Sequence, residues 1–138
     1  MNYEILDFDI HGDSRGKLVA LEGGREIPFD VKRIYYIYDT LVDQDRGQHA
    51  HRDLEQIIIA INGSCDFLLD DGRGSQETVH LSQPDQGLFI GKNIWREMKH
   101  FSDDCKLVIL ASKHYDEKEY IRNYEDFIKE IQDDSSPV

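Results

Sequence analysis

Two histidines one residue apart, His49 and His51, are followed by Glu55 and by an apolar run that closes at Asn62-Gly63. In an extended segment alternate side chains point to the same side, so the two imidazoles can act on one object. Imidazole and carboxylate groups either bind divalent metals or transfer protons. Three interpretations therefore remain open: a metal site, an acid-base pair, or two polar residues near the end of a strand.

The segments that would position these side chains are short apolar runs separated by Gly, Asp, Asn and Ser. This spacing predicts an antiparallel sandwich or barrel of many short strands. Asn62-Gly63 predicts a hairpin because both residues tolerate positive φ, and the Asp-Asp-Gly at 70 to 72 marks the next turn. Asp116 can cap a helix, and apolar positions from 120 to 131 recur with a helical period. We therefore expect an all-β fold with one C-terminal α-helix.

Length and charge limit the classes of function. The 138 residues are enough for one domain, so we expect residues 1–138 to form a single unit. The formal charge of −12 argues against nucleic acid or an anionic membrane as a partner. We expect no signal peptide, because the start has no basic segment followed by an apolar core, and no membrane span, because no run approaches about 18 apolar residues. A cytoplasmic protein follows, with Cys65 and Cys105 as buried thiols rather than a disulfide.

The pattern His-x-His-x3-Glu, with Gly63 near a turn, resembles the first motif of the cupin barrels. In that family the three side chains enter the barrel lumen, and many members bind a divalent metal there. A metal would need a further ligand from a later strand, but the corresponding stretch, GLFIGKNIWREMKHF, has Arg96 in that place. A guanidinium cannot ligate a cation and repels it. We therefore expect no metal, and two imidazoles that titrate near neutrality and move protons.

Arginines indicate what such a lumen would accept. Arg33 and Tyr35 share one face of a predicted strand, and Arg46 lies just before the histidines. Arginine forks match phosphate oxygens, and a tyrosine hydroxyl relays protons or hydrogen-bonds a sugar. If Arg15, Arg33, Arg46 and Arg96 converged in one barrel, they would form a selective anion site in an acidic chain. Each arginine taken alone is equally consistent with a surface ion pair.

Six ordered blocks of the chain resemble one family of small cupin enzymes, the dTDP-4-oxo-6-deoxyglucose 3,4-ketoisomerases. The blocks are DSRGKLVALE, IPFDVKRIYYIYDT, RGQHAH, LEQIIIAINGSC, GLFIGKNIWREM and LVILASKHYDEKEYIRNYEDF. The resemblance implies a cupin jelly-roll β-barrel, a homodimer that exchanges N-terminal strands, and catalysis with neither a metal nor an organic cofactor. It also implies conversion of dTDP-4-oxo-6-deoxy-D-glucose to a 3-oxo sugar, which serves deoxyamino-sugar synthesis for surface polysaccharides such as lipopolysaccharide O-antigen or S-layer glycan.

The same resemblance implies that His49 and His51 lie beside the hexose, with Tyr35 nearby and the arginines on the diphosphate. The C3 proton of a 4-oxo sugar is acidified by the adjacent carbonyl, so a neutral histidine can abstract it if a donor or cation stabilises the enolate. We expect His49 to be the base, His51 to relay the proton and Tyr35 to be the hydroxyl partner. Glu55 would orient a histidine or serve a structural role.

Two questions stay open at this point. The product configuration at C4 is undecided, because Arg15 resembles the galacto-forming members of the family and Arg96 resembles the gluco-forming ones. The activity has two alternatives: a nucleotide-sugar 3,5-epimerase with a related barrel and a histidine base, and a sugar-binding or scaffolding cupin without catalysis. Relocation of the carbonyl distinguishes the ketoisomerase from both.

Overall fold

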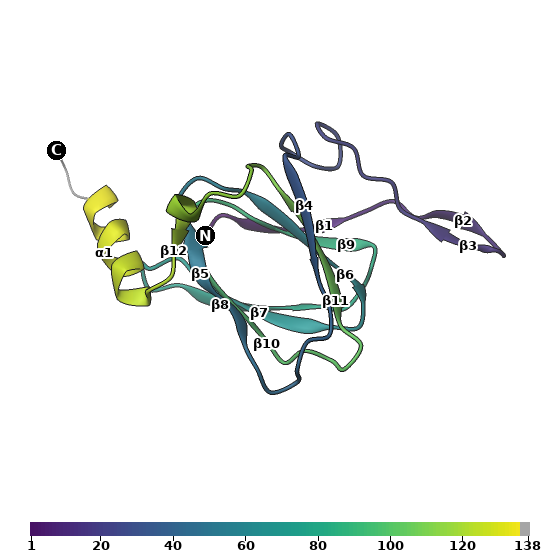
Figure 1. The fold of residues 1–138 in the computed structure, drawn as a ribbon. Coiled ribbons are helices and arrows are strands. Elements are labelled where there is room, and N and C mark those ends of the chain that lie inside the picture. Colours follow the sequence, from purple (N-terminus) through teal and green to yellow (C-terminus); the bar gives the residue numbers. More distant parts are fainter. Residues whose placement is uncertain (136–138) are drawn as a thin grey trace.

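The computed structural model describes residues 1–135, which form a barrel of two five-stranded antiparallel sheets with one α-helix on its outside (Figure 1). The first sheet has the order β1 (Tyr3–Asp7), β9 (Gln86–Ile90), β6 (Gln56–Asn62), β11 (Lys106–Ala111) and β4 (Arg33–Ile37). The second has the order β12 (Tyr120–Ile121), β5 (Arg46–His51), β10 (Trp95–Lys99), β7 (Cys65–Asp70) and β8 (Gln76–Leu81). The expected all-β fold with a C-terminal helix is confirmed. No helix among the described residues is long and apolar enough to cross a membrane.

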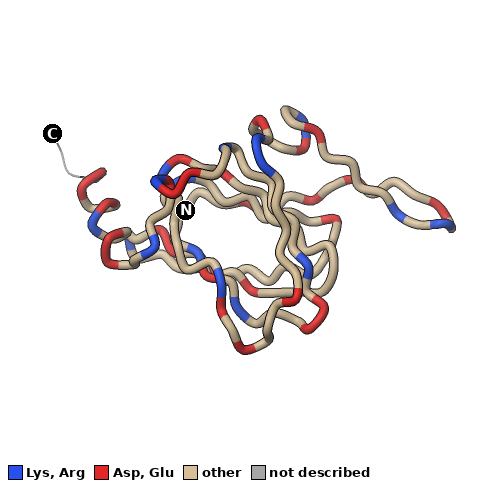
Figure 2. Tube along the Cα trace, in the orientation of Figure 1, with Lys and Arg blue, Asp and Glu red and all other residues tan. Residues whose placement is uncertain are grey.

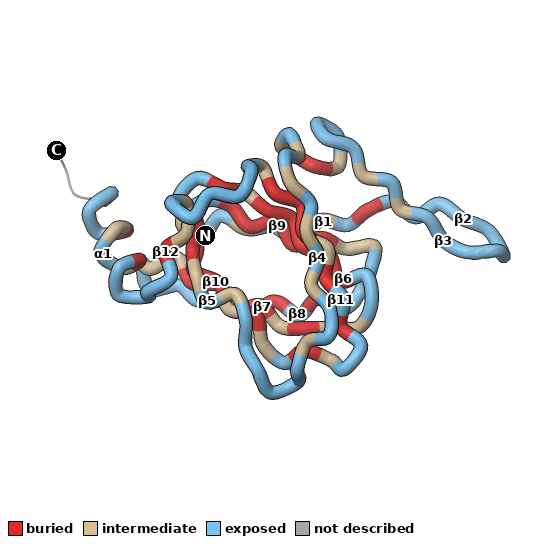
Figure 3. Tube along the Cα trace, in the orientation of Figure 1, coloured by how far each residue is buried: buried red, intermediate tan, exposed pale blue. Residues whose placement is uncertain are grey.

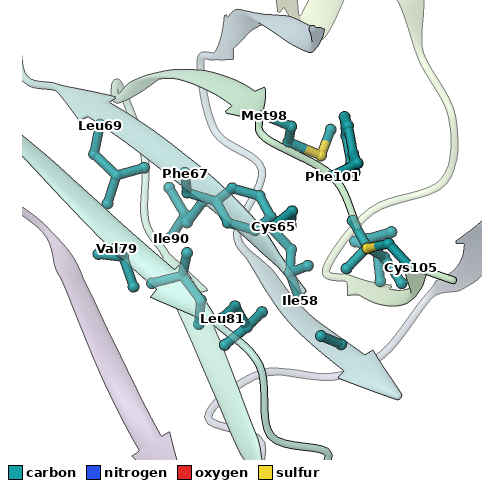
Figure 4. Packing of buried hydrophobic residues seen from close by; sticks show 14 of the residues in the cluster. Ile58, Cys65, Phe67, Leu69, Val79, Leu81, Ile90, Met98, Phe101 and Cys105 are labelled. Carbon is teal, nitrogen blue, oxygen red and sulfur yellow. The ribbon is translucent and has the colours of Figure 1, made fainter. Parts of the chain in front are cut away.

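Alternation along the strands decides which side chains face the inside of the barrel. In β7 Cys65, Phe67 and Leu69 are buried, whereas Asp66 and Leu68 between them are partly exposed. Inward residues of both sheets pack as one apolar cluster (Figure 4), and Figure 3 shows the buried stretches of the same strands. The cluster consists of Ile58, Ala60, Cys65, Phe67, Leu69, Val79, Leu81, Leu88, Ile90, Ile94, Met98, Phe101, Cys105, Leu107 and Ile109. Both cysteines are free and buried within it.

The inward-facing row of side chains changes from polar to apolar along the barrel. In β6 Gln56 is followed at two-residue spacing by Ile58 and Ala60, and in β10 Arg96 is followed by Met98. A hydrogen bond from Arg96 to Gln56 joins the two sheets at the polar end. The apolar end therefore supplies packing, and the polar end is left for chemistry.

The turn at Asn62-Gly63 is not the hairpin predicted from its sequence. The strands on either side of it, β6 and β7, belong to different sheets, so the turn carries the chain across the barrel. Gly63 has a φ of 66°, and a Cβ at this position would come within 2.8 Å of the Cα of Cys105. The hairpin prediction is wrong because strand pairing here is decided by the barrel and not by the local turn. The turn after β7 does close a hairpin, with β8.

The C-terminal segment contains more than the predicted helix. Asp116 caps a 3₁₀ helix, η1 (Glu117–Glu119), and not an α-helix. The chain then forms β12, and α1 (Tyr124–Ser135) begins after Asn123, whose side-chain oxygen accepts from the N–H of Asp126 at 3.1 Å. The predicted helix start is therefore wrong. Positions 120 and 121 satisfy the helical period but pair with β5.

Helix α1 packs against the outer face of the second sheet. Phe127 and Ile131 are buried together with Trp95 of β10. The hydroxyl of Tyr124 donates to the carboxylate of Asp70, the last residue of β7, at 2.6 Å. The helix thereby holds the chain that precedes it, including β12, against the barrel.

A separate hairpin, which we call the arm, is formed by β2 (His11–Asp13) and β3 (Gly16–Leu18). It projects away from the barrel (Figure 1), and every residue of both strands is exposed. The turn of the arm carries Arg15. An exposed two-stranded hairpin has little stability of its own, so the arm needs a surface to pack on.

Candidate active site

Strand β5 presents His49 and His51 together at the polar end of the barrel. Their Nε2 atoms lie 3.0 Å apart in hydrogen-bond contact, and the rings are close to perpendicular at 83°. His51 is fully buried and His49 is half-buried. The two side chains therefore share one side of the strand, as period-two alternation predicted.

A hydrogen-bonded chain of three side chains crosses the lumen beside the histidines. Arg96, which is opposite His49 in the β10–β5 register, is 1% exposed and donates to the side-chain oxygen of Gln56 at 2.7 Å. A second Arg96 nitrogen donates to the carbonyl of Ile94 at 3.0 Å. The amide nitrogen of Gln56 donates to the hydroxyl of Tyr35 at 2.7 Å. The guanidinium, the amide and the phenol are thus fixed relative to one another.

Gln56 was missed by the sequence analysis, which selected its neighbour Glu55. The structure does not bring Glu55 into hydrogen-bond contact with either histidine in the described part of the chain. Its backbone N–H donates to Ser112 Oγ at 2.9 Å, and the residue is half-buried just before β6. Periodicity in the sequence does not select Gln56, because the apolar run that follows it is buried on both faces of β6.

The electrostatics of the lumen keep both imidazoles neutral. Burial, and then the positive charge of Arg96, lower the pKa of His49 to about 3. The same causes, in the same order, lower the pKa of His51 well below its ordinary value, and His49 contributes further. The expectation that these imidazoles titrate near neutrality is therefore wrong for the free protein. One Nε2 carries a proton and donates it to the other, which is the arrangement that a neutral pair requires.

Burial also shifts the pKa values of Tyr35 and Arg96. It raises the pKa of the Tyr35 phenol above its ordinary value. It lowers the pKa of Arg96 to about 10, because a cation is disfavoured away from water. At neutral pH Arg96 thus remains charged and Tyr35 remains a hydroxyl, beside two neutral imidazoles.

Several buried side-chain nitrogens in this region have no hydrogen-bond partner within residues 1–135. They include two nitrogens of Arg33, Nε of Arg96 and Nδ1 of His51. The Arg33 guanidinium lies 5.1 Å from the ring centre of Tyr35 and 5.6 Å from that of Tyr115. Unsatisfied buried donors cost free energy, and a bound molecule with acceptor oxygens would satisfy them. Arg33 and Arg96 thus both lie near Tyr35 with unpartnered nitrogens, and their role in binding an anion stays a prediction.

The other two predicted arginines are placed differently. Arg46 is exposed at the beginning of β5, on the strand that carries the histidines. Arg15 lies in the arm, where its guanidinium pairs with Asp13 at 2.6 Å, and within one chain it does not reach the barrel lumen. Figure 2 shows acidic positions interspersed with the basic ones along the loops and α1. The convergence of four arginines is thus only partly realised in a single copy.

Tyr120 is the second residue that the sequence analysis missed. Its ring centre lies 4.5 Å from that of His51 and 5.1 Å from that of His49. The helical period had assigned position 120 to the face of a helix. Its actual place follows from β12, in which it is opposite His51 in the ladder with β5.

The metal that many cupins hold does not fit these residues. No group of three or more His, Cys, Asp or Glu side chains arranged to hold a metal ion is found among the described residues. The position opposite His49 is filled by the Arg96 guanidinium, which has no lone pair to donate to a cation. Two histidines beside a buried cation are a poor donor set for a divalent ion.

Comparison with known proteins shows the family. A family model described as FdtA: WxcM-like, C-terminal, matches residues 1–132. The chain belongs to the FdtA family. A TDP-4-oxo-6-deoxy-alpha-D-glucose-3,4-oxoisomerase from Aneurinibacillus thermoaerophilus is 48% identical over 131 residues, which are 95% of this chain and 94% of that protein.

Solved structures of similar proteins include 3,4-ketoisomerases. A 3,4-ketoisomerase from Helicobacter canadensis is 54% identical, covers 96% of this chain and 98% of its own, and has a TM-score of 0.93. QdtA, a 3,4-ketoisomerase from Thermoanaerobacterium thermosaccharolyticum, was solved as a histidine-to-asparagine mutant with TDP-4-keto-6-deoxyglucose. It is 39% identical with a TM-score of 0.93, and the match covers 99% of this chain and 98% of that one. This FdtA-family chain is an isomerase of the sugar 3,4-ketoisomerase type.

The epimerase alternative is supported only at the level of the fold. A 3′-monoepimerase from Streptomyces bikiniensis is 19% identical to this FdtA-family chain with a TM-score of 0.74, over 86% of this chain and 67% of its own. At that identity the likeness shows a shared barrel and nothing about the reaction.

The depressed pKa values of the histidines predict a loss of stability in acid. In the unfolded chain an imidazole takes up a proton near pH 6.5, whereas folded His49 stays neutral down to about pH 3. Between pH 6.5 and about pH 3 the unfolded state binds more protons than the folded state. The stability that comes from keeping the histidine neutral is therefore fully present above pH 6.5 and is lost as the pH falls. We expect each histidine to remove about 1.4 kcal/mol per pH unit below 6.5 from the free energy of unfolding.

Urea unfolding of the wild type and of His49→Asn at pH 7.5, 6.5 and 5.5 measures this effect. The variant should show a shallower fall in the free energy of unfolding, because one of the two proton-binding sites of its unfolded state is gone. Carboxylates titrate in both proteins and cancel in the comparison. Identical slopes would mean that His49 is not held neutral by the fold.

Proposed function

We propose that this chain moves the carbonyl of a TDP-linked 4-oxo-6-deoxyglucose from C4 to C3, with neither a metal nor an organic cofactor. The observation that carries the proposal is the neutral His49–His51 pair beside the buried cation Arg96. Such a lumen pairs a proton acceptor with a group that stabilises negative charge on oxygen. The relatives named above as 3,4-ketoisomerases support the same reaction.

The chemistry removes a proton from C3 and from O3 and adds one to O4 and to C4. A neutral imidazole, which we assign to His49, takes the proton from C3 while negative charge develops on O4. Arg96 or the Tyr35 hydroxyl stabilises that charge, and protonation of O4 gives an enediol. Loss of the O3 proton and delivery of a proton to C4 then leave the carbonyl at C3, with no net change in redox state. The Nε2 contact gives His51 a direct path for relaying the proton.

The unpartnered nitrogens of Arg33 provide an anion site for the diphosphate at the edge of the lumen. The diphosphate would also oppose the charge of Arg96 that lowers the pKa of the histidines. Substrate binding would thus raise the basicity of the pair when a base is needed. We assign Arg46 to the same anion and give Glu55 a structural role through its backbone bond to Ser112.

The first test is incubation of the protein with TDP-4-oxo-6-deoxyglucose in heavy water, followed by NMR of the sugar ring. We expect deuterium from the solvent at C4 of the product, with the carbonyl at C3. His49→Asn should reduce turnover by about 10²- to 10⁴-fold, because it removes the base but keeps a polar side chain of similar shape. His80→Asn, on the outer side of the second sheet beside Asp66, is the matched control and should retain activity.

Three outcomes would contradict parts of this proposal. Exchange at C3 and C5 without relocation of the carbonyl would indicate an epimerase, and binding without exchange would indicate a sugar-binding cupin. Wild-type turnover in His49→Asn would remove that residue from the mechanism. Loss of activity after exhaustive chelation, restored by one divalent ion, would contradict catalysis without a metal.

A homodimer in which the arms are exchanged fits the surfaces of the chain. The outer side of the first sheet exposes Ile34, Tyr36 and Ile61 at 63%, 69% and 49%. Apolar side chains gathered on one sheet face mark an interface. The arm, which is without a packing surface on its own barrel, would extend to the second copy and carry Arg15 toward that copy's lumen. We therefore propose that Arg15 binds substrate in the partner's site.

Complementation tests this arrangement. Arg15→Ala should bind substrate weakly, and His49→Asn should be inactive, whereas the two chains coexpressed should regain activity. One site of each mixed dimer would then combine an intact His49 with an intact Arg15 from the other copy. Sedimentation equilibrium should give the mass of two chains. A monomer, or mixed dimers without recovered activity, would contradict the exchanged arm.

Arg96 also bears on the configuration of the product. A guanidinium is a poor proton donor, so the donor to C4 is one of the histidines, acting on the face from which C3 was deprotonated. H3 and H4 lie on opposite faces of a gluco sugar, so delivery on the face that C3 lost its proton from gives the galacto configuration. Trapping the 3-oxo product with a 3-aminotransferase should therefore give small H3–H4 and H4–H5 couplings, whereas large ones would mean gluco and delivery from the opposite face. An unchanged product ratio in Arg96→His would contradict this role of Arg96.

The product of the proposed reaction indicates which kind of pathway would use it. A nucleotide-linked 3-oxo-6-deoxy sugar is the substrate that an aminotransferase needs to place nitrogen at C3. We propose that residues 1–138 act as a single cytoplasmic domain that supplies such a sugar for a surface polysaccharide, either lipopolysaccharide O-antigen or S-layer glycan. Nucleic acid and membranes have no part in this function, in keeping with the net charge of −12.

A further inference from the structure

The histidine pair lacks the polar support that usually orients a reactive imidazole. Such a ring normally donates its second N–H to a carboxylate or a backbone carbonyl, which fixes both tautomer and orientation. Here Nδ1 of His51 is buried without a hydrogen-bond partner in the described part of the chain. The hydrogen bond between the two Nε2 atoms joins the rings to each other but not to the scaffold.

Tyr120 makes the ring contacts that connect the pair to the scaffold. Its ring meets His51 at 4.5 Å with an interplanar angle of 65°, and meets His49 at 5.1 Å with an angle of 51°. Among the described residues it is the aromatic side chain in ring contact with both imidazoles. The terminal torsion of histidine is broad, so packing of this kind decides which way each ring nitrogen points.

A cation also lies against the Tyr120 ring. The guanidinium carbon of Arg122 lies 4.3 Å from the ring centre. Glu117 accepts from two Arg122 nitrogens at 2.8 and 3.0 Å and holds the guanidinium in place. The phenol ring thus contacts one fixed cation in addition to the two imidazoles.

Tyr120 is connected to the outer side of the barrel through its neighbour Ile121. Ile121 is buried with Ala50, Trp95, Phe127 and Ile131, which joins β12 to β5, β10 and α1. An ion pair between Arg52, just after β5, and Glu130 of α1 at 2.6 Å adds a second link. The docked helix thereby determines where the Tyr120 ring lies.

Building on the proposed function, we propose that Tyr120 is a positioning residue that holds the His49–His51 pair in one tautomeric arrangement through ring packing. Its hydroxyl is not required for this task. Helix α1, which does not approach the histidines itself, supports their chemistry through Ile121 and Tyr120.

Two variants separate the ring from the hydroxyl. Tyr120→Leu removes the aromatic contacts and should lower kcat by about 10- to 100-fold, with KM changed much less, since the base is misplaced while the anion site is intact. Tyr120→Phe keeps the ring and is the matched control, with kcat within about threefold of the wild type. Equal losses in both variants would overturn positioning by the ring and assign the role to the hydroxyl.

A readout that does not depend on turnover comes from long-range ¹H–¹⁵N spectra of the histidine rings. The wild type and Tyr120→Phe should show one Nε2–H and one Nδ1–H tautomer for His49 and His51, and Tyr120→Leu should show averaged tautomers. If Tyr120→Leu fails to fold, Tyr120→Met fills the space with a flexible side chain and should give the same averaging.

Failure of the positioning role and failure of the proposed function give different results. Unchanged tautomers in folded Tyr120→Leu, in a protein whose turnover depends on His49, would overturn the positioning role and leave the reaction intact. Averaged tautomers in a protein that does not relocate a carbonyl would leave the positioning intact and overturn the proposed function.

Discussion

A guanidinium enclosed in a β-barrel is the constraint on which the rest of this structure depends. Arg96 is almost fully buried, and removing such a cation from water costs several kcal/mol unless its donors are satisfied. Gln56 and the carbonyl of Ile94 meet part of that need, and Gln56 in turn fixes Tyr35. The same charge disfavours protonation of the neighbouring imidazoles and occupies the place that a metal ligand would need. Burial, and then the charge of this cation, thus account for the neutrality of the histidines.

The barrel divides its interior between stability and reactivity. Large aliphatic and aromatic side chains fill one end, and both cysteines lie within that packing. At the other end the same strands present Gln56, Arg96 and the histidines, with several donors unsatisfied. Free energy gained from apolar burial at the first end offsets the cost of unpartnered polar groups at the second. A site with unmet hydrogen bonds is therefore tolerable in a domain of this size.

Local periodicity predicted the strands, the barrel and the shared side of His49 and His51, because a two-residue repeat has direct spatial meaning. It did not separate Gln56 from Glu55, since the point where β6 begins is decided by pairing with other strands. It also assigned position 120 to a helix, because a short strand and a helix start can share the same apolar spacing. Pairings across the barrel, the burial that shifts the pKa values, and the departure of Arg15 with the arm depend on contacts between distant segments. These contacts cannot be predicted from a single sequence.

The pairing of β12 with β5 sets an order of events during synthesis. The histidines are synthesised about seventy residues before β12, the strand that pairs with β5. Strands β1 and β4 likewise pair with strands that are synthesised much later, β9 and β11. While the ribosome still holds residues 120–135, the barrel lacks an edge strand and its helix. Until that segment has emerged, the nascent chain exposes an open, polar lumen. An incomplete chain from interrupted translation would contain both imidazoles but lack the aromatic ring that orders them.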